Sequence, residues 1–291
     1  MNNVNCCPNN TNSSDCADVL QGLGYSVVFL LGFLVNAAAL WAFIGKRKSW
    51  TDTHIYMLNL AIADSLLVIF LPFRIYDSFF CLPKTGLCTF LILLHFTNMY
   101  ASIGTTTAIS VQRYLAVRFP MQARLWKRKK EAAFVVCLVL WVVLLIMCVV
   151  FREENYPERL WTCFDRCKDQ PLSLKFVLLL VVFGFFIPLL VVVFCSSRII
   201  CVLAKADDKT DEKRNIVNIV TANMIVFIIC YTPIHVAFLV NFFNHKLEKW
   251  ECKYIPAHVF LLVSEWIAST NCCFDSISYY FLLKGFFSER T

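Results

Sequence analysis

Seven long apolar runs, separated by short polar connections, dominate this sequence of 291 residues. Each run holds about 20 residues or more and is largely free of charge, which is what an α-helix needs to span a bilayer. The sequence therefore predicts an all-α membrane protein, a bundle of seven transmembrane helices. The runs lie at residues 22–45, 54–79, 86–118, 132–151, 173–203, 215–244 and 254–283.

The composition supports this fold class. Of all residues, 59% are hydrophobic and 16% are charged, whereas a soluble domain has about 25% charged residues. The net charge of +7 does not indicate nucleic acid as a partner, because of the way the basic residues are distributed along the chain. Residues 1–16 are polar and lack the apolar core of a cleavable signal peptide, so the first long helix is expected to act as the targeting element.

The basic residues predict the orientation in the membrane. Lysine and arginine dominate the connections after the first, third and fifth runs, whereas the other connections mix them with acidic residues. By the positive-inside rule the N-terminus lies outside the cell and, after seven spans, the C-terminus lies in the cytoplasm. The glycosylation sequons at Asn9 and Asn12 agree with this orientation. We expect a multi-pass plasma-membrane protein with an extracellular glycosylated tail (1–21), a seven-helix domain (22–283) and a short amphipathic cytoplasmic helix (284–291).

The stretch from Cys88 to Pro120 is the one around which we expect the rest to be organised. It opens on a cysteine and stays almost uncharged until Gln112-Arg113-Tyr114. A helix from Cys88 to Arg113 would be roughly 37 Å long, a little more than the thickness of a bilayer core. This end of an apolar run resembles the third helix of a rhodopsin-like G protein-coupled receptor, with the Asp-Arg-Tyr signature altered to Gln-Arg-Tyr.

Other runs carry further signature residues of that family. The first contains Gly32-Phe33-Leu34-Val35-Asn36, the fourth Trp141 and the fifth Pro188. The sixth has Tyr231 in place of the usual tryptophan, and the seventh has Ser276 in place of the usual proline. The resemblance implies a switch for G protein coupling. Its residues are Gln112, Arg113, Tyr114, Phe227, Tyr231, Pro233, Asp275 and Tyr279.

Three stretches resemble one subgroup of the family. They are Trp50–Ala61, Phe194-Cys195-Ser196 and the sequence Asn-Cys-Cys-Phe-Asp at 271–275. All three are similar to the small group that contains the lysophosphatidylinositol receptor and the kynurenate-responsive orphan receptor. The resemblance covers the whole seven-helix body.

Gln112 stands where the family usually has a carboxylate, which holds the neighbouring arginine by an ion pair. An amide can only hydrogen-bond, so we expect a weaker hold on Arg113 and raised signalling without ligand. The alternative is that other contacts of the arginine compensate.

Asp64 and Asp275 lie inside the second and seventh runs, where ionisable side chains are costly and often functional. In the family the matching residues line a water-filled cavity that can hold a sodium ion. The resemblance implies such a site at Asp64, Asn98, Ser102 and Asp275. A hydrogen-bonded polar core without an ion is the alternative, and no other cofactor is expected.

The resemblance also implies disulfides on the extracellular side, where oxidising conditions preserve them. Cys88 and Cys163 match the near-universal disulfide of the family. Cys16 and Cys252 match a pairing that is seen in related lipid and nucleotide receptors. The pairing of the other outer cysteines stays open.

Two ligand classes are excluded by the residues expected to face the pocket. His95 stands where amine receptors carry an aspartate, so no anionic partner for a ligand ammonium is expected. The seventh run lacks a lysine, which excludes a retinal Schiff base.

The positive candidates indicate an acidic ligand. Arg74 lies inside the second run, and its planar guanidinium suits a carboxylate; alternatively, it pairs with Glu265 or Asp77 in a structural role. A basic rim above an apolar interior suits an acid with a hydrophobic body: a lysophospholipid, a fatty-acid derivative or an aromatic carboxylate. His95 and His235 have the alternative role of neutral, hydrogen-bonded core residues. The candidate ligand residues are Arg74, His95, Phe96, Met99, Tyr100, Arg152, Arg166, Tyr231, His235, Phe238 and Glu265.

The sequence thus predicts a receptor whose partners are a small acidic or lipid ligand, a heterotrimeric G protein and membrane lipids. The altered arginine motif and seventh helix leave an alternative open, a non-coupling or constitutively active scavenger or heterodimer partner. A transporter is a remote alternative, because no internal repeat occurs. No recognisable nucleophile–base pair or metal-ligand spacing occurs, so an enzyme is not expected.

Overall fold

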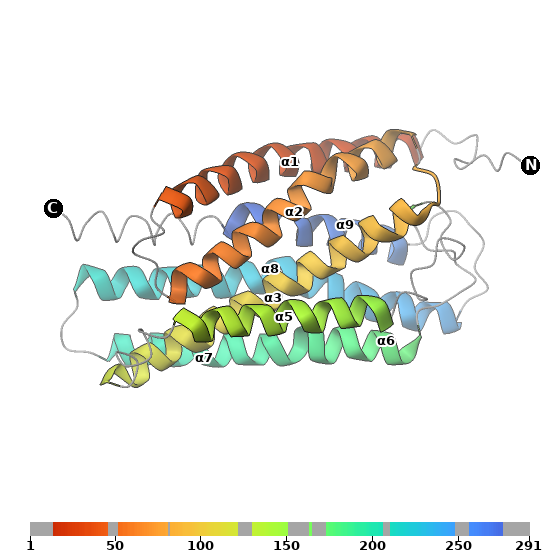
Figure 1. The fold of residues 1–291 in the computed structure, drawn as a ribbon. Coiled ribbons are helices and arrows are strands. Elements are labelled where there is room, and N and C mark those ends of the chain that lie inside the picture. The colour runs from red at the N-terminus through yellow and green to blue at the C-terminus, as the bar shows by residue number, and fades with distance from the viewer. Residues whose placement is uncertain are drawn as a thin grey trace, which may run out of the picture.

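The computed structural model describes residues 14–45, 52–80, 82–121, 130–150, 163–164, 173–205, 210–247 and 256–275. All regular structure in these ranges is helical (Figure 1). The helices are α1 (Ser14–Gly45), α2 (Asp52–Phe80), α3 (Gly86–Arg118), α5 (Lys130–Val150), α6 (Leu174–Leu178), η4 (Leu179–Phe186), α7 (Ile187–Ala204), α8 (Asp211–Leu247) and α9 (Pro256–Ser269).

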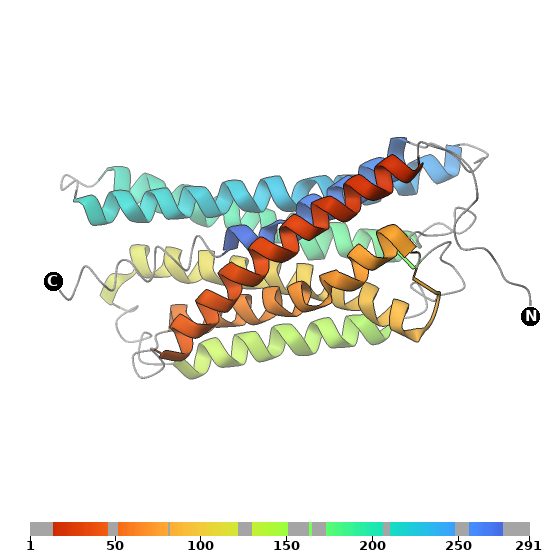
Figure 2. The same cartoon turned by 90° about the horizontal axis from the view of Figure 1, so that it is seen from above.

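These helices form one elongated bundle and run along its long axis in both views (Figures 1 and 2). Six of the described spans are long and apolar enough to cross a membrane. Helix α9 and the residues that follow it up to position 275 are the described part of the seventh apolar run, and the rest of the run lies outside the described residues. Together with the family match reported below, the bundle confirms the predicted all-α, seven-helix membrane fold.

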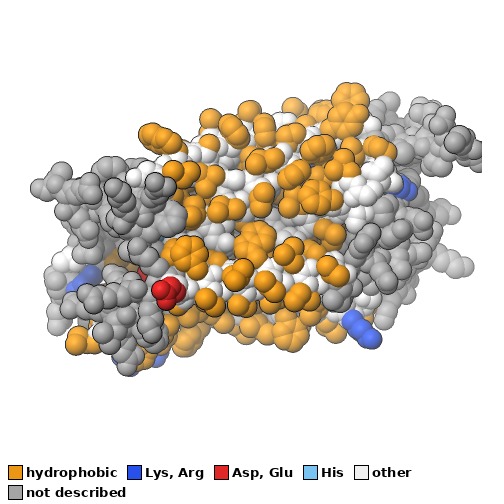
Figure 3. All heavy atoms as spheres, viewed as in Figure 1, with side chains coloured by type: hydrophobic (Ala, Val, Ile, Leu, Met, Phe, Trp, Pro, Cys, Tyr) orange, Lys and Arg blue, Asp and Glu red, His pale blue; other side chains and the backbone are white. Residues whose placement is uncertain are grey.

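The outer surface of the bundle is apolar. Trp41, Leu138 and Phe183 are 82%, 64% and 66% exposed, and hydrophobic side chains cover most of the described face in Figure 3. Charged side chains on that face lie toward its two ends. A contiguous apolar surface of this size is not stable in water, so the sides of the bundle face lipid tails.

Two helix boundaries differ from those expected. Helix α1 already begins at Ser14, so residues 14–21, which we assigned to the extracellular tail, are helical. Helix α9 is interrupted by a turn at Thr270, whose backbone N–H donates to the carbonyls of both Trp266 and Ile267, and the chain is helical again from 271 to 275. The seventh run is thus interrupted before it reaches Ser276, where the usual proline is missing.

The fifth apolar run contains a π-helical segment. Ser173 caps the start of α6 by accepting a hydrogen bond from the backbone N–H of Phe176 (3.3 Å). Helices α6, η4 and α7 then follow without a break, and the backbone N–H of Ile187 donates to the carbonyl of Val182, five residues earlier. Pro188 has no N–H to donate, which favours the wider turn. Such segments occur often at functional sites.

Helix α3 occupies the centre of the bundle and is held there by polar contacts. Asn59 on α2 donates from Nδ2 to the hydroxyl of Thr105 on α3 (2.9 Å), and its Oδ1 accepts from the indole of Trp141 on α5 (2.8 Å). One buried amide therefore joins three helices. These bonds fix the position of α3 along the bundle axis, and so they also fix where its side chains lie at both ends of the bundle.

Candidate functional site

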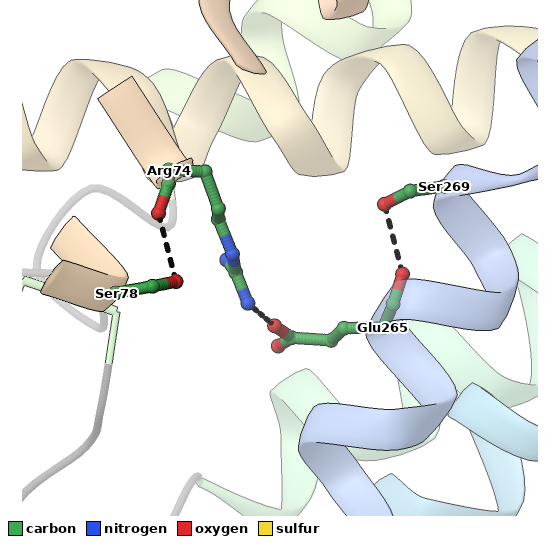
Figure 4. A network of polar contacts seen from close by, with 4 residues as sticks. All are labelled: Arg74, Ser78, Glu265 and Ser269. Carbon is green, nitrogen blue, oxygen red and sulfur yellow. Dashed lines mark hydrogen bonds and ion pairs between the residues drawn. The ribbon is translucent and has the colours of Figure 1, made fainter. Parts of the chain in front are cut away.

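Arg74 and Glu265 form a buried ion pair between α2 and α9 (Figure 4). Their side chains are only 6% and 9% exposed. Each lies on a helix that carries a further local bond: Ser78 donates to the carbonyl of Arg74 (3.1 Å), and Ser269 donates to the carbonyl of Glu265 (2.9 Å). Of the two carboxylates considered from the sequence, Glu265 holds the guanidinium, whereas Asp77 accepts from a backbone N–H at the end of α2.

Two aromatic rings lie over the guanidinium of Arg74. The carbon at its centre is 5.1 Å from the ring centroid of Tyr25 on α1 and 4.2 Å from that of Phe164. The Nε donor of Arg74 has no hydrogen-bond partner among the described residues. The site therefore combines a stabilised cation with one unused buried donor. The sequence analysis did not single out either ring, because both contacts join residues that are distant in the chain.

Phe164 is positioned by the disulfide between Cys88 and Cys163. This bond joins the start of α3 to the described residues 163–164 between α5 and α6, with a Cα–Cα distance of 5.5 Å. Both cysteines are fully buried, and Phe164 packs against their cluster together with Phe96. The predicted Cys16–Cys252 pair involves residues whose side chains lie outside the described part of the chain.

The other predicted ligand residues form an aromatic layer between α3 and α8. The ring of His95 meets Phe96 edge-on (5.7 Å), and Phe96 packs against Phe238 (5.9 Å). Met99, Tyr100, Tyr231 and His235 are buried below them. Arg152 and Arg166, which were expected to contribute positive charge, lie outside the described residues.

His235 makes internal bonds through both ring nitrogens. Nδ1 lies 2.7 Å from the carbonyl oxygen of Tyr231, and Nε2 lies 3.2 Å from the hydroxyl of Tyr100. Phe185, which the sequence analysis missed, stacks on the imidazole at 4.2 Å. In the sequence, only the position of Phe185 shortly before Pro188 could have drawn attention to it. Its place in the core could not be predicted from helical periodicity, because the π-helical segment changes which residues face the core.

A polar cluster lies in the interior of the bundle, around Asp64 and Asp275. Ser102 donates to Asp64 (3.4 Å), and Asn271 donates to Asp275 (2.6 Å). Asp64, Asn98, Ser102 and Asn271 line one small cavity. The Oδ1 of Asn98 has no hydrogen-bond partner among the described residues. Carboxylate, amide and hydroxyl oxygens are the ligands that suit a hard cation, so these residues fit the expected sodium ion. Asp275 lines the neighbouring cavity instead.

That second cavity contains most of the described switch residues. It is lined by Arg113, Phe227, Tyr231 and Asp275, among other residues of α2, α3, α7 and α8. Four of the predicted switch residues thus share one cavity. Pro233 lies inside α8, and the ring of Tyr114 packs against α7 through Phe194 (5.8 Å). Tyr279 lies outside the described residues.

Gln112 is bonded to a different helix and not to Arg113. Its Nε2 donates to the hydroxyl of Thr53 on α2 (3.0 Å). Within the described ranges, no carboxylate forms an ion pair with Arg113. The partner of Gln112 could not have been found from the motif itself, because Thr53 is 59 residues earlier in the chain.

Comparison with known proteins assigns the family. Residues 35–279 match the family described as 7 transmembrane receptor (rhodopsin family). The chain is 36% identical to human G-protein coupled receptor 35, over 89% of this chain and 82% of that protein. It is 32% identical to human G-protein coupled receptor 55, over 94% and 91%, and 32% identical to lysophosphatidic acid receptor 6 from Gallus gallus, over 92% and 94%. These relatives confirm the subgroup that the sequence indicated, and members of this family are receptors and not enzymes. The chain belongs to the rhodopsin family of seven-transmembrane, G protein-coupled receptors.

Proposed function

We propose that this receptor is activated at the plasma membrane by an acidic ligand with a hydrophobic body, either lipid-like or an aromatic carboxylate. The observation that carries the proposal is the buried guanidinium of Arg74, which keeps an unused donor at Nε beneath the ring of Phe164. A buried, incompletely satisfied guanidinium favours an anion that can bond in its plane. The apolar layer of Phe96, Met99 and Phe238 beside it suits the hydrophobic body.

Two features outside the site support this proposal. Relatives of the chain include lysophosphatidic acid receptors 4 and 6, whose named ligand is an acidic lipid. The positive-inside rule places the N-terminus outside the cell, so the end of the bundle that carries Arg74 and the Cys88–Cys163 disulfide faces the extracellular medium. In this orientation the cavity lined by Arg113 faces the cytoplasm and a heterotrimeric G protein.

Activation then shifts an equilibrium that exists without ligand, by the difference in the ligand's affinity for the two states. Helix α8 swings about Pro233, where the missing N–H weakens the helix. Phe227 and Tyr231 repack, and the cavity beside Arg113 opens to the G protein. A sodium ion held by Asp64, Asn98 and Ser102 would supply a fixed positive charge beside a buried carboxylate, and so bias the equilibrium toward the state in which its cavity is closed.

A panel of G protein dissociation sensors in cells tests the proposed function. The probes are lysophosphatidylinositol, lysophosphatidic acids and aromatic carboxylates, and Arg113→Ala is the coupling-deficient control. We expect a response to at least one acid that is absent from the control at equal surface level. Silence of every G protein, with ligand and without it, would contradict the proposal and favour the non-coupling alternative.

We expect Gln112→Asp to lower signalling without ligand. The new carboxylate can pair with Arg113, which has no described ion-pair partner, whereas the native amide is bonded to Thr53. An ion pair of ~0.6 kcal/mol would lower agonist-free signalling about threefold. The measurement is G protein dissociation per receptor at the surface. Thr53→Val is the matched control, because it releases Gln112 without adding a charge. If Gln112→Asp signals as strongly as the native protein without ligand, the expectation that Gln112 weakens the hold on Arg113 is wrong.

A further inference from the structure

His235 lies two residues after Pro233 inside α8 and is buried, with 1% of its surface exposed. Its Nδ1 is 2.7 Å from the carbonyl oxygen of Tyr231. A carbonyl can only accept a hydrogen bond, so Nδ1 carries the proton and donates it. The imidazole is therefore tied to the backbone of the same turn that contains the proline.

This bond decides what the other ring nitrogen can do. In a neutral imidazole that donates from Nδ1, Nε2 is an acceptor. The hydroxyl of Tyr100, 3.2 Å away, is its donor. The pair links α3 to α8 close to Pro233, inside a hydrophobic cluster. The sequence left open whether His235 faces a ligand or is a neutral, hydrogen-bonded core residue, and in the structure both of its nitrogens are used within the protein.

The face of the imidazole is held by a third helical segment. Phe185 on η4 stacks on it at 4.2 Å, with 12° between the ring planes. The same phenylalanine lies parallel to Phe227 (6.2 Å, 8°), and Phe227 meets Tyr231 edge-on (5.2 Å). Parallel and edge-on aromatic contacts at these distances are stabilising. The imidazole is thus in direct or one-step contact with both aromatic residues that repack in the proposed switch.

Tyr100 is confined in the same way. A Cβ atom at Gly184 would lie 2.5 Å from the ring of Tyr100, so this ring packs directly against the backbone of η4. The absence of a side chain at Gly184 makes room for the tyrosine, and the π-helical segment places Gly184 and Phe185 together against α3 and α8. Three helical segments therefore fix one histidine.

We propose that His235 is a positioning residue for receptor activation, which braces α8 near Pro233 against α3 and holds Phe227 and Tyr231 in the resting arrangement. The bond from Tyr100 to Nε2 opposes movement of α8 relative to α3. The bond from Nδ1 to the carbonyl of Tyr231 and the stack on Phe185 oppose repacking of the aromatic cluster. This role rests on the receptor family and the geometry, and it does not depend on which ligand is bound.

Removing the hydroxyl of Tyr100 tests the brace. We expect Tyr100→Phe to raise agonist-free signalling per surface receptor about fivefold, the change that follows from losing one hydrogen bond of ordinary strength. The readout is dissociation of a panel of G proteins in cells without added ligand, normalised to surface level. Tyr76→Phe is the matched control, because Tyr76 is half exposed on α2, remote from the cluster. Unchanged or reduced basal signalling of Tyr100→Phe would overturn the proposal.

A double-mutant cycle separates the hydrogen bond between Tyr100 and His235 from a local packing effect. His235→Phe preserves a ring to stack on Phe185 and removes both nitrogens. In that background the hydroxyl of Tyr100 has no acceptor, so adding Tyr100→Phe should leave basal signalling unchanged or bring it closer to native. Independent, multiplicative effects of the two substitutions would show that the residues are not coupled. The double variant leaves no polar atom of the pair unsatisfied, so it remains testable if a single variant fails to reach the surface.

Discussion

Arg74→Met should remove most of the receptor from the cell surface, because it leaves the carboxylate of Glu265 buried without its partner. Breaking a buried ion pair by removing one member costs about 3–5 kcal/mol, which is a large part of the stability of a typical domain. Both side chains are less than a tenth exposed, so water cannot replace the lost partner. Surface labelling and the thermal stability of the extracted protein measure this loss. Lys84→Met, in the exposed connection before α3, is the control for loss of a positive charge.

The double variant Arg74→Met/Glu265→Met distinguishes a structural role of the pair from a ligand role. Replacing both partners of a buried ion pair by well-packed hydrophobic groups of similar size is often close to neutral for stability, so we expect the surface level to recover. If Arg74 binds the acid of the ligand, this well-folded variant should not respond to acidic ligands that activate the native receptor. A response at native potency would restrict Arg74 to a structural role.

Glu265 alone gives an opposite expectation for ligand potency. In Glu265→Gln the guanidinium keeps a hydrogen-bonding partner but loses its internal anion, so this variant should also reach the surface at a lower level. In the receptors that do reach it, an acidic ligand no longer competes with a carboxylate. We expect such a ligand to act at roughly tenfold lower concentration, for a competing interaction worth ~1.4 kcal/mol. The dose–response curve of the acid found in the panel measures this shift. Lower potency at equal surface level would contradict competition between Glu265 and the ligand.

The membrane fold was predictable because length and apolar content alone define a spanning helix. Residues 86–118 were expected as one span and are helix α3 without change, since this run has no proline and few charges. The polar ends of the helices could not be placed from apolar content, for a physical reason. Helix α1 extends back to Ser14, beyond its apolar run, because a helix can continue into water once its apolar part is anchored.

The candidate site was predictable only as a set of residue types. Arg74 was recognisable as a costly charge in an apolar run, but choosing Glu265 as its partner over Asp77 required the tertiary structure, in which an ion pair joins α2 to α9. Thr53 as the partner of Gln112 depends on a contact between α2 and α3. The role of Phe185 depends on the π-helical segment, which shifts the helical register by part of a turn. Periodicity predicts faces of regular helices and cannot predict such a shift.

The hydrogen bonds of Tyr100 and His235 reduce the number of polar groups that a ligand could contact. Tyr100 and His235 use their polar atoms on each other and on the backbone, so they offer no free group to a ligand. Arg74 on α2 and His95 on α3 are candidates outside this pair, whereas Phe238 is on α8 and meets the ring of His235 edge-on (5.9 Å). In the proposed mechanism, a ligand that contacts Arg74 and His95 therefore acts on α8 at Pro233 through the layer that contains Tyr100 and His235.

The second large effect is expected from removing the Cys88–Cys163 disulfide with Cys88→Ser/Cys163→Ser. The bond closes a loop with a sequence separation of 75 residues, and loss of such a constraint costs roughly 4 kcal/mol. It also releases Phe164 from its place 4.2 Å from the guanidinium of Arg74, so potency for an acidic ligand should fall further than surface level does. Thermal unfolding and ligand dose–response curves measure the two effects, and brief reduction of the native receptor should reproduce both. Cys201→Ser, at an exposed free cysteine of α7, is the control. Unchanged potency in the receptors that still reach the surface would show that Phe164 takes no part in recognition.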